Sequence, residues 1–202
     1  MTALTDEKAA VVFNHFKNQP PNSGMLTTWD AVRAFMFAGA AVFTLVSVKT
    51  GVRFTYKVRV KKSDVGKVDS AWVTHFVNLL RGPSNEKDFV YMGVVRNNPP
   101  RFFWTSKSGR VGRQAPAYKA LLWALDAMAG RREGVLGAIL EFWHEGRCGR
   151  CGRRLTVPDS IASGYGPECV LMKQKEAAFV GRVSAPVPVA APLGQGTLWS
   201  AV

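Results

Sequence analysis

Hydrophobic and polar residues alternate with a two-residue period from Val52 to Lys61. Every second residue is valine, phenylalanine or tyrosine, and the residues between them are arginine, lysine or threonine. Because successive side chains of a strand point to opposite faces, the pattern predicts a strand with one buried face and one basic face. Residues 42–48 are β-branched and aromatic, and the turn residues 49–51 separate the two runs. Together they predict a β-hairpin.

Three further runs follow at residues 72–80, 89–95 and 101–107, separated by Gly-, Pro- and Asn-rich turns. Residues 72–80 are compatible with a helix as well as a strand. We expect an antiparallel, hairpin-linked sheet of about five strands.

A helical period of apolar residues marks residues 5–18, a segment after Thr27 or Thr28 that ends near Gly39, and a segment that opens at Pro116. The last of these is expected to cover the sheet, which makes the fold class α+β. The predicted organisation is a helical segment at 1–39, a sheet with a covering helix and a basic face at 40–135, a metal module at 136–182, and a flexible Ala/Pro-rich tail at 183–202.

The motif His144-x3-Cys148-x2-Cys151-x17-Cys169 uses all three cysteines of the chain. A Cys-x2-Cys knuckle closed by a later cysteine is typical of a Zn²⁺ site, and a tetrahedral Cys3His shell leaves no open position. We therefore expect a structural zinc ion. A helix that begins near Cys169 would complete a treble-clef-like module.

Other interpretations of this motif remain open. The cysteines could be free and buried, or a redox pair, although the strand–motif–helix context of a redox Cys-x2-Cys is not recognisable here. His144 follows Phe142 and Trp143 and could lie in a core instead of binding the metal. An odd number of cysteines gathered in one motif indicates a reducing compartment.

Residues 149–156, Gly-Arg-Cys-Gly-Arg-Arg-Leu-Thr, and residues 164–169, Gly-Tyr-Gly-Pro-Glu-Cys, carry a resemblance. The chain resembles phage- and prophage-encoded proteins of unassigned function that share a C-terminal Cys-Gly-x-Cys-Gly … Gly-x-Gly-Pro-x-Cys zinc element. Segments 43–56 and 82–86 are also similar, so the resemblance spans roughly residues 33–170. It implies a phage or mobile-element origin and a zinc-bound module, but no activity.

The chain has 202 residues, of which 47% are hydrophobic, and a net charge of +13 from 27 basic and 14 acidic residues. Such an excess of positive charge favours an anionic partner, above all nucleic acid. We recognise no signal peptide and no apolar stretch long enough to span a membrane. The expected location is the cytoplasm, that of a bacterial host if a phage encodes the protein, with no membrane partner.

Basic residues are densest in two stretches. Residues 49–67 contain seven lysines or arginines and one acid, and residues 96–119 contain six and no acid. Aromatic residues at 102–104 and 118 interleave with the second stretch, where they could stack on bases or belong to the core. The candidate nucleic-acid contacts are Arg53, Lys57, Arg59, Lys61, Arg101, Phe103, Lys107, Arg110, Arg113, Arg150, Arg153 and Arg154.

We recognise no nucleotide-binding loop, no serine-hydrolase elbow and no His-Glu-x-x-His motif, so we expect a protein without enzymatic activity. The first hypothesis is a phage-type protein that binds nucleic acid, with single-stranded DNA favoured. An alternative is an inhibitor or adaptor of a host defence or replication protein, to which Leu198 and Trp199 could contribute. A third is a metal-dependent nuclease, whose magnesium ligands would come from Asp64, Asp69, Glu86 and Asp88.

Overall fold

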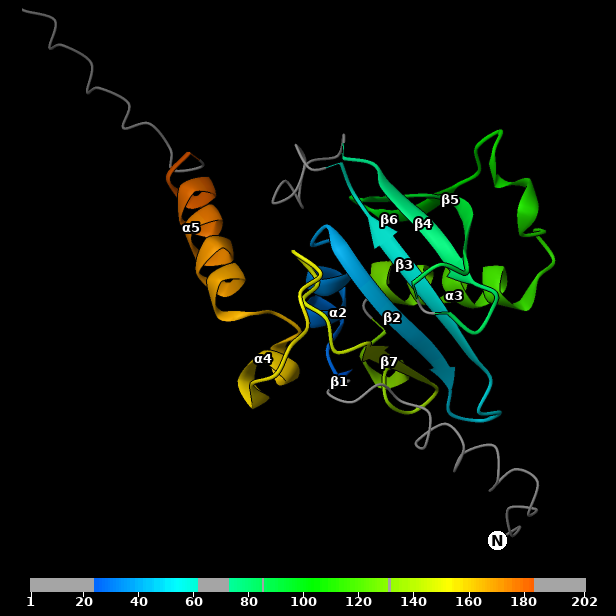
Figure 1. Ribbon diagram of the computed structural model, residues 1–202, viewed down its shortest axis with the longest axis horizontal. Coiled ribbons are helices and arrows are strands. Elements are labelled where there is room, and N and C mark those ends of the chain that lie inside the picture. Colours follow the sequence, from blue (N-terminus) through cyan, green and yellow to red (C-terminus); the bar gives the residue numbers. More distant parts are fainter. Residues whose placement is uncertain (1–23, 62–72, 85, 131, 184–202) are drawn as a thin grey trace, which may run out of the picture.

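The computed structural model describes residues 24–61, 73–84, 86–130 and 132–183 (Figure 1). The helix predicted at 5–18, Asp64, Asp69 and the tail with Leu198 and Trp199 lie outside these residues. The described part is α+β: an antiparallel sheet of seven strands with helices α2 and α3 on one face. None of the described helices is long and apolar enough to cross a membrane.

The elements follow one another along the chain with two 3-10 turns between them. They are β1 (Gly24–Leu26), α2 (Trp29–Met36), β2 (Ala40–Ser47), β3 (Arg53–Arg59), β4 (His75–Leu80), β5 (Phe89–Asn97), β6 (Pro100–Phe103), η2 (Ser108–Arg110), α3 (Pro116–Ala129), η3 (Glu133–Val135), β7 (Leu140–His144), α4 (Pro158–Ser163) and α5 (Pro167–Val183).

The strand order is β1-β7-β2-β3-β4-β5-β6. The five predicted strands are confirmed as β2 to β6, which pair as successive antiparallel neighbours. β6 is shorter than expected and ends at Phe103, because the backbone N–H of Thr105 donates to Ser108 Oγ at 2.9 Å and the chain turns there. Lys107 therefore precedes a 3-10 turn and does not continue the strand.

Two strands were not expected from the sequence. β7 lies between β1 and β2, with Phe142 opposite Leu26 on one side and Leu45 on the other. These strands come from the segments that the sequence analysis assigned to the N-terminal helices and to the metal module. One sheet therefore includes parts of three of the four predicted segments.

The main core fills the space between the inner face of the sheet and helices α2 and α3 (Figure 1). Three inner-face rings stack in a row: Phe142 lies 4.5 Å from Phe43, and Phe43 lies 5.5 Å from Tyr56 between ring centroids. The Tyr56 hydroxyl donates to the carbonyl of Ala117 in α3 at 2.7 Å. Burial raises the pKa of Tyr56, so this phenol stays neutral and ties the sheet to α3.

The alternation expected for β3 is present. Tyr56 and Val58 are buried against the helices, whereas Arg53 and Arg59 are exposed and Lys57 is half-buried on the outer face. Helix α2 begins after the expected cap, since Thr28 Oγ1 accepts from the backbone N–H of Ala31 at 3.3 Å. Both helices pack on the inner face, so neither covers the outer face, where Arg53 and Arg59 are exposed but Val42, Thr44 and Val46 of β2 are buried.

Candidate metal centre and adjoining basic face

The three cysteines converge, with their Sγ atoms all within 4.8 Å of one another. Cys148 and Cys151 lie on a tight turn, in which Cys148 N–H donates to Arg153 O at 2.8 Å and Gly152 N–H donates to Cys148 O at 2.9 Å. Cys169 lies in the first turn of α5 and, like Cys148, is buried. The knuckle and the helix thus bring ligands that are distant in sequence to one place.

The surroundings shift the pKa values of two thiols in opposite directions. Burial alone would raise the pKa of Cys148, but backbone N–H groups of Cys151, Gly166 and Arg150 outweigh it and lower this pKa. The pKa of Cys169 is raised to about 12 by burial and by the neighbouring thiols of Cys151 and Cys148. A bound divalent cation offsets this mutual repulsion, because metal ligation stabilises deprotonated thiols.

The sulfur positions fit a tetrahedral metal. Zn–S bonds of about 2.3 Å place the sulfurs of a tetrahedral site about 3.8 Å apart. The sulfurs lie at most 4.8 Å apart, so small side-chain adjustments would bring them to the spacing of a tetrahedral site. The three cysteines could hold a metal ion. Among the described residues, no histidine, further cysteine or carboxylate joins this group as a fourth ligand.

His144 is not part of the three-cysteine group, although we expected it from the sequence to be the fourth metal ligand. Its ring is fully buried at the end of β7, where Nδ1 accepts from the backbone N–H of Gly146 at 3.1 Å. The other nitrogen, Nε2, therefore carries the proton and donates to the carbonyl of Ile161 at 2.6 Å. Burial lowers the pKa of His144, although the bond to Ile161 opposes the shift. The neutral ring is used to fix α4 to the sheet.

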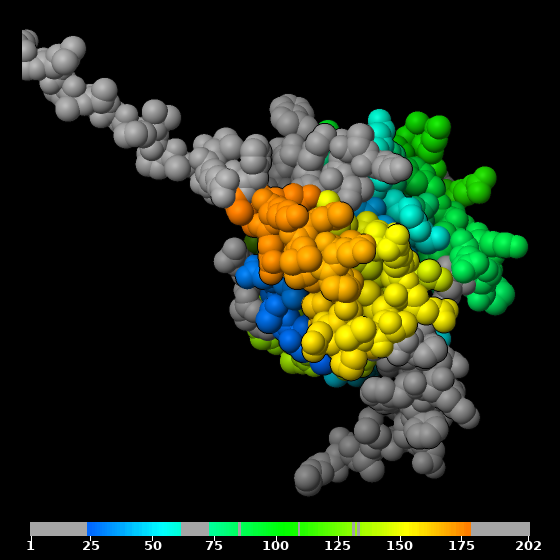
Figure 2. Space-filling view, turned by 60° about the vertical axis from the view of Figure 1, so that its left-hand side comes forward, coloured from blue at the N-terminus to red at the C-terminus, as the bar shows by residue number. Residues whose placement is uncertain are grey.

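The position of Phe35 in α2 explains why two residues of the motif, Gly149 and Gly164, are glycines. A Cβ on Gly149 would lie 2.8 Å from Phe35 Cδ2, and a Cβ on Gly164 would lie 2.7 Å from the same atom. Phe35 is fully buried and also contacts the rings of His144 and Tyr165. The glycines therefore make room for Phe35, and the metal module docks directly on the helix that supports the sheet (Figure 2).

The arginines of the module are held in different ways. Arg150 donates to both carboxylate oxygens of Glu176 at 2.8 and 2.6 Å and is mostly buried, so its charge is engaged within the module. Arg153 and Arg154 are exposed, and Arg153 lies 3.6 Å from Glu168. Arg150 therefore stabilises the position of α5, whereas Arg153 and Arg154 remain accessible.

Aromatic and basic side chains share the outer face of the sheet. Lys57 Nζ lies 3.7 Å above the centroid of the Phe89 ring. The guanidinium of Arg96 lies 5.2 Å from the Phe103 ring, and Arg96 stands opposite Arg101 in the register of β5 and β6. Phe103 is 37% exposed. These residues form a strip in which cations lie beside accessible rings.

The neighbouring aromatic residues belong to the other side. Phe102 stands opposite Val95, which is buried, and its ring packs edge-on against Trp104 and Tyr118. The core interpretation therefore holds for Phe102, while Phe103 is on the outer face.

The remaining candidates lie near the ends of the sheet. Lys61 is exposed just beyond β3, and Lys107, Arg110 and Arg113 are exposed between β6 and α3. Arg113 lies 5.1 Å from the ring of Trp104. These four extend the positive surface but are not part of the outer-face strip in β3, β5 and β6.

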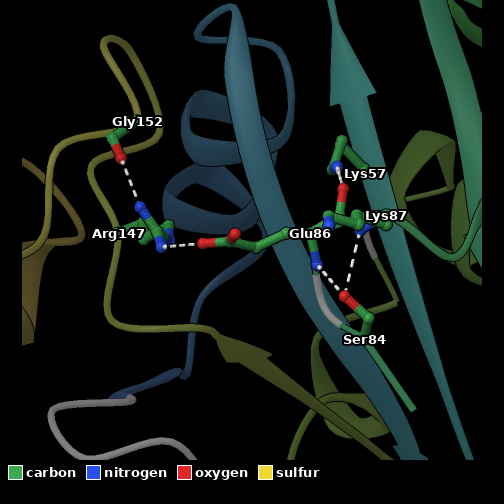
Figure 3. Close-up of polar contacts among 6 residues, drawn as sticks. All are labelled: Lys57, Ser84, Glu86, Lys87, Arg147 and Gly152. Carbon is green, nitrogen blue, oxygen red and sulfur yellow. Dashed lines mark hydrogen bonds and ion pairs between the residues drawn. The ribbon is translucent and has the colours of Figure 1, made fainter.

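A polar bridge joins the sheet to the metal module (Figure 3). Glu86, in the loop between β4 and β5, lies 3.6 Å from Arg147, and its backbone carbonyl accepts from Lys57 Nζ at 3.4 Å. Arg147 also donates to Gly152 O at 3.4 Å, within the knuckle. Arg96, Arg147 and Phe89 were not among the candidate nucleic-acid contacts predicted from the sequence. Only strand pairing shows that Arg96 faces the same side as Arg101, and the β7 connection places Arg147 near Lys57.

Comparisons with known proteins match one part of the chain. The family described as "Family of unknown function (DUF6011)" matches residues 138–170, which contain β7, the knuckle and Cys169. The match agrees with the resemblance to a family of unassigned function, and it covers the three clustered cysteines. No curated protein matches the chain. No solved structure matches it either.

Proposed function

We propose that the protein binds nucleic acid, with single-stranded DNA favoured, through the outer face of the sheet and the arginine-rich knuckle. The observation that carries this proposal is the outer-face strip, where Lys57 covers Phe89 and Arg96 lies beside the exposed Phe103. Cations neutralise backbone phosphates, and rings stack on unpaired bases without regard to sequence. A net charge of +13 supports the same conclusion.

Zinc is the metal we infer for the three-cysteine group, in a treble-clef-like module made of the knuckle and α5. Its role would be structural: it would hold the knuckle loop, and with it Arg153 and Arg154, beside the sheet. Thiolate ligands suit zinc, and no redox change is then needed. A phage or mobile-element origin, with action in the cytoplasm of a bacterial host, fits this proposal.

The direct test is a fluorescence-anisotropy titration of the metal-loaded protein with single- and double-stranded DNA and RNA oligonucleotides at two salt concentrations. We expect binding whose affinity falls steeply with salt, with a slope of about 0.7 per phosphate contact for single strands. Absence of binding at low salt would overturn the proposal and favour a protein partner with an acidic surface. Recovery of cleaved oligonucleotides in magnesium would instead favour a nuclease.

A pair of matched variants tests the stacking strip. Phe103→Ala should weaken binding of single-stranded DNA by about 5- to 150-fold, since a stacked base contributes about 1–3 kcal/mol. Trp123 in α3 is the control, because it is 36% exposed against 37% for Phe103 but lies on the helix side. Equal effects of Phe103→Ala and Trp123→Ala would contradict the assignment of the binding face.

Charge reversal provides a second pair. Arg101→Glu should weaken binding, whereas Lys119→Glu makes the same change in net charge on the exposed side of α3 and should have a much smaller effect. Similar losses in both variants would indicate attraction to the net charge without a defined face.

A further inference from the structure

Three cations from two parts of the fold approach one another beside the Cys148 knuckle. Lys57 and Arg59 come from the outer face of β3, and Arg147 comes from the loop that precedes Cys148. Burial lowers the pKa of Lys57, and the positive charges of Arg59 and Arg147 lower it further. The group therefore has an excess of positive charge that a bound anion would relieve.

Glu86 supplies the carboxylate that faces this group, but it holds the position weakly. Its carboxylate lies 3.6 Å from Arg147, and its side chain is 76% exposed (Figure 3). The loop is fixed by other contacts, since Ser84 N–H donates to Asp88 Oδ2 at 2.8 Å. An exposed ion pair of this kind contributes little stability, so a phosphate can displace the carboxylate without unfolding the loop.

We propose that Lys57, Arg59 and Arg147 form a phosphate-binding site at the junction of the sheet and the metal module, and that the Glu86 carboxylate occupies it in the free protein. The ligand chemistry is a phosphate group. Its source is the nucleic-acid backbone if the proposed function holds, on which this part of the inference rests, or a free polyphosphate. The site shares Lys57 with the stacking strip and takes Arg147 from the knuckle loop, so one strand could contact both.

Removing the charge of Glu86 and removing the charge of Arg147 should have opposite effects on the affinity for phosphate. Glu86→Gln removes the competing charge and should tighten binding by about two- to fivefold, the range expected from losing an exposed ion pair. Arg147→Gln should weaken binding and reduce the salt slope by about 0.7. Asp126→Asn is the control, because Asp126 forms an exposed ion pair with Arg132 at 3.0 Å and neither residue belongs to the proposed binding surface.

The experiment measures two ligands with the metal-loaded proteins. An oligothymidylate is titrated by anisotropy, and inorganic tripolyphosphate is titrated by calorimetry. Tighter binding by Glu86→Gln than by Asp126→Asn, together with weaker binding by Arg147→Gln, supports the site. Equal effects of the two acid-to-amide substitutions overturn it. Because Arg147 also contacts Gly152, Lys57→Gln replaces Arg147→Gln if the latter loses metal.

The two ligands separate failure of the site from failure of the proposed function. If tripolyphosphate follows the expected order of variants and no oligonucleotide binds, the site stands and the nucleic-acid proposal fails. If the oligonucleotide binds with equal affinity to all variants, the nucleic-acid proposal stands and the site is refuted.

Discussion

Gly164 offers the sharpest test of how the metal module docks on the sheet. It ends α4 in the left-handed conformation, with φ of 75°, and its N–H donates to Ser160 O at 2.9 Å. A Cβ at this position would lie 2.7 Å from Phe35 Cδ2, a distance at which one of the two groups must shift. Gly164→Ala therefore introduces both backbone strain and overlap with a buried ring.

The expected loss of stability is the sum of these two effects. A non-glycine residue in the left-handed region costs about 1–2 kcal/mol. Forcing an extra methyl group into a packed core costs about 1–3 kcal/mol. A central estimate is therefore about 3 kcal/mol, which for a protein of this size lowers the melting temperature by about 6–12 °C.

Two other glycines separate the contributions. Gly152 also has a φ of 75°, but a Cβ there would meet only Ala40 Cβ at 3.8 Å, so Gly152→Ala should show the backbone cost alone. At Gly166 no left-handed φ is present and a Cβ would meet nothing within 4 Å, so Gly166→Ala should leave stability nearly unchanged. Thermal denaturation of metal-loaded proteins gives the comparison. Equal melting temperatures for the Gly164 and Gly166 variants would refute the docking described here.

Three further outcomes are expected. Cys151→Ser should lose the metal and loosen the knuckle and α5 while the sheet persists. Metal content and circular dichroism measure the two effects, and retained stoichiometric metal would contradict the ligand assignment. His144→Gln should keep the metal and lose about 1–3 kcal/mol in urea unfolding, because buried backbone groups lose a partner; loss of metal with unchanged stability would restore His144 as a ligand. Burial raises the pKa of Glu145, so its ionised form is disfavoured in the fold and Glu145→Gln should stabilise the protein at pH 7. That gain should shrink as the pH falls toward the ordinary carboxyl pKa of about 4.5, and a gain independent of pH would exclude this cause.

The sequence predicted best what depends on local periodicity. The ten residues from Val52 alternate without interruption, and burial of Tyr56 and Val58 in β3 follows that alternation. Thr28 and Pro116 mark the starts of α2 and α3, because a side-chain cap and a proline at the first turn act within a few residues.

Long-range pairing could not be predicted in the same way. β1 has three residues and β7 has five, too few for a period to show, and both are strands because their backbones find partners far away in sequence. The alternation Leu140-Glu-Phe-Trp-His is visible afterwards, but it runs directly into the cysteine motif.

The position of His144 follows from the pairing of β7 with β2. Spacing alone makes it a plausible ligand, four residues before Cys148. As the last residue of β7 it stands opposite Phe43 in β2. Backbone groups engage both ring nitrogens, Nδ1 with Gly146 and Nε2 with Ile161 of α4, and His144 is not part of the three-cysteine group.

A metal bound by the three cysteines would contribute to the proposed anion binding without contacting the anion. Phe35 packs against both glycines that flank the knuckle and against the ring of Tyr165, so the module has a fixed position on the helix that supports the sheet. A metal held by the three cysteines would fix the loop that carries Arg147, and that loop determines how far Arg147 lies from Lys57. We therefore expect loss of the metal to weaken the proposed phosphate binding at Arg147 more than base stacking on Phe103, whose position depends on β5 and β6 alone.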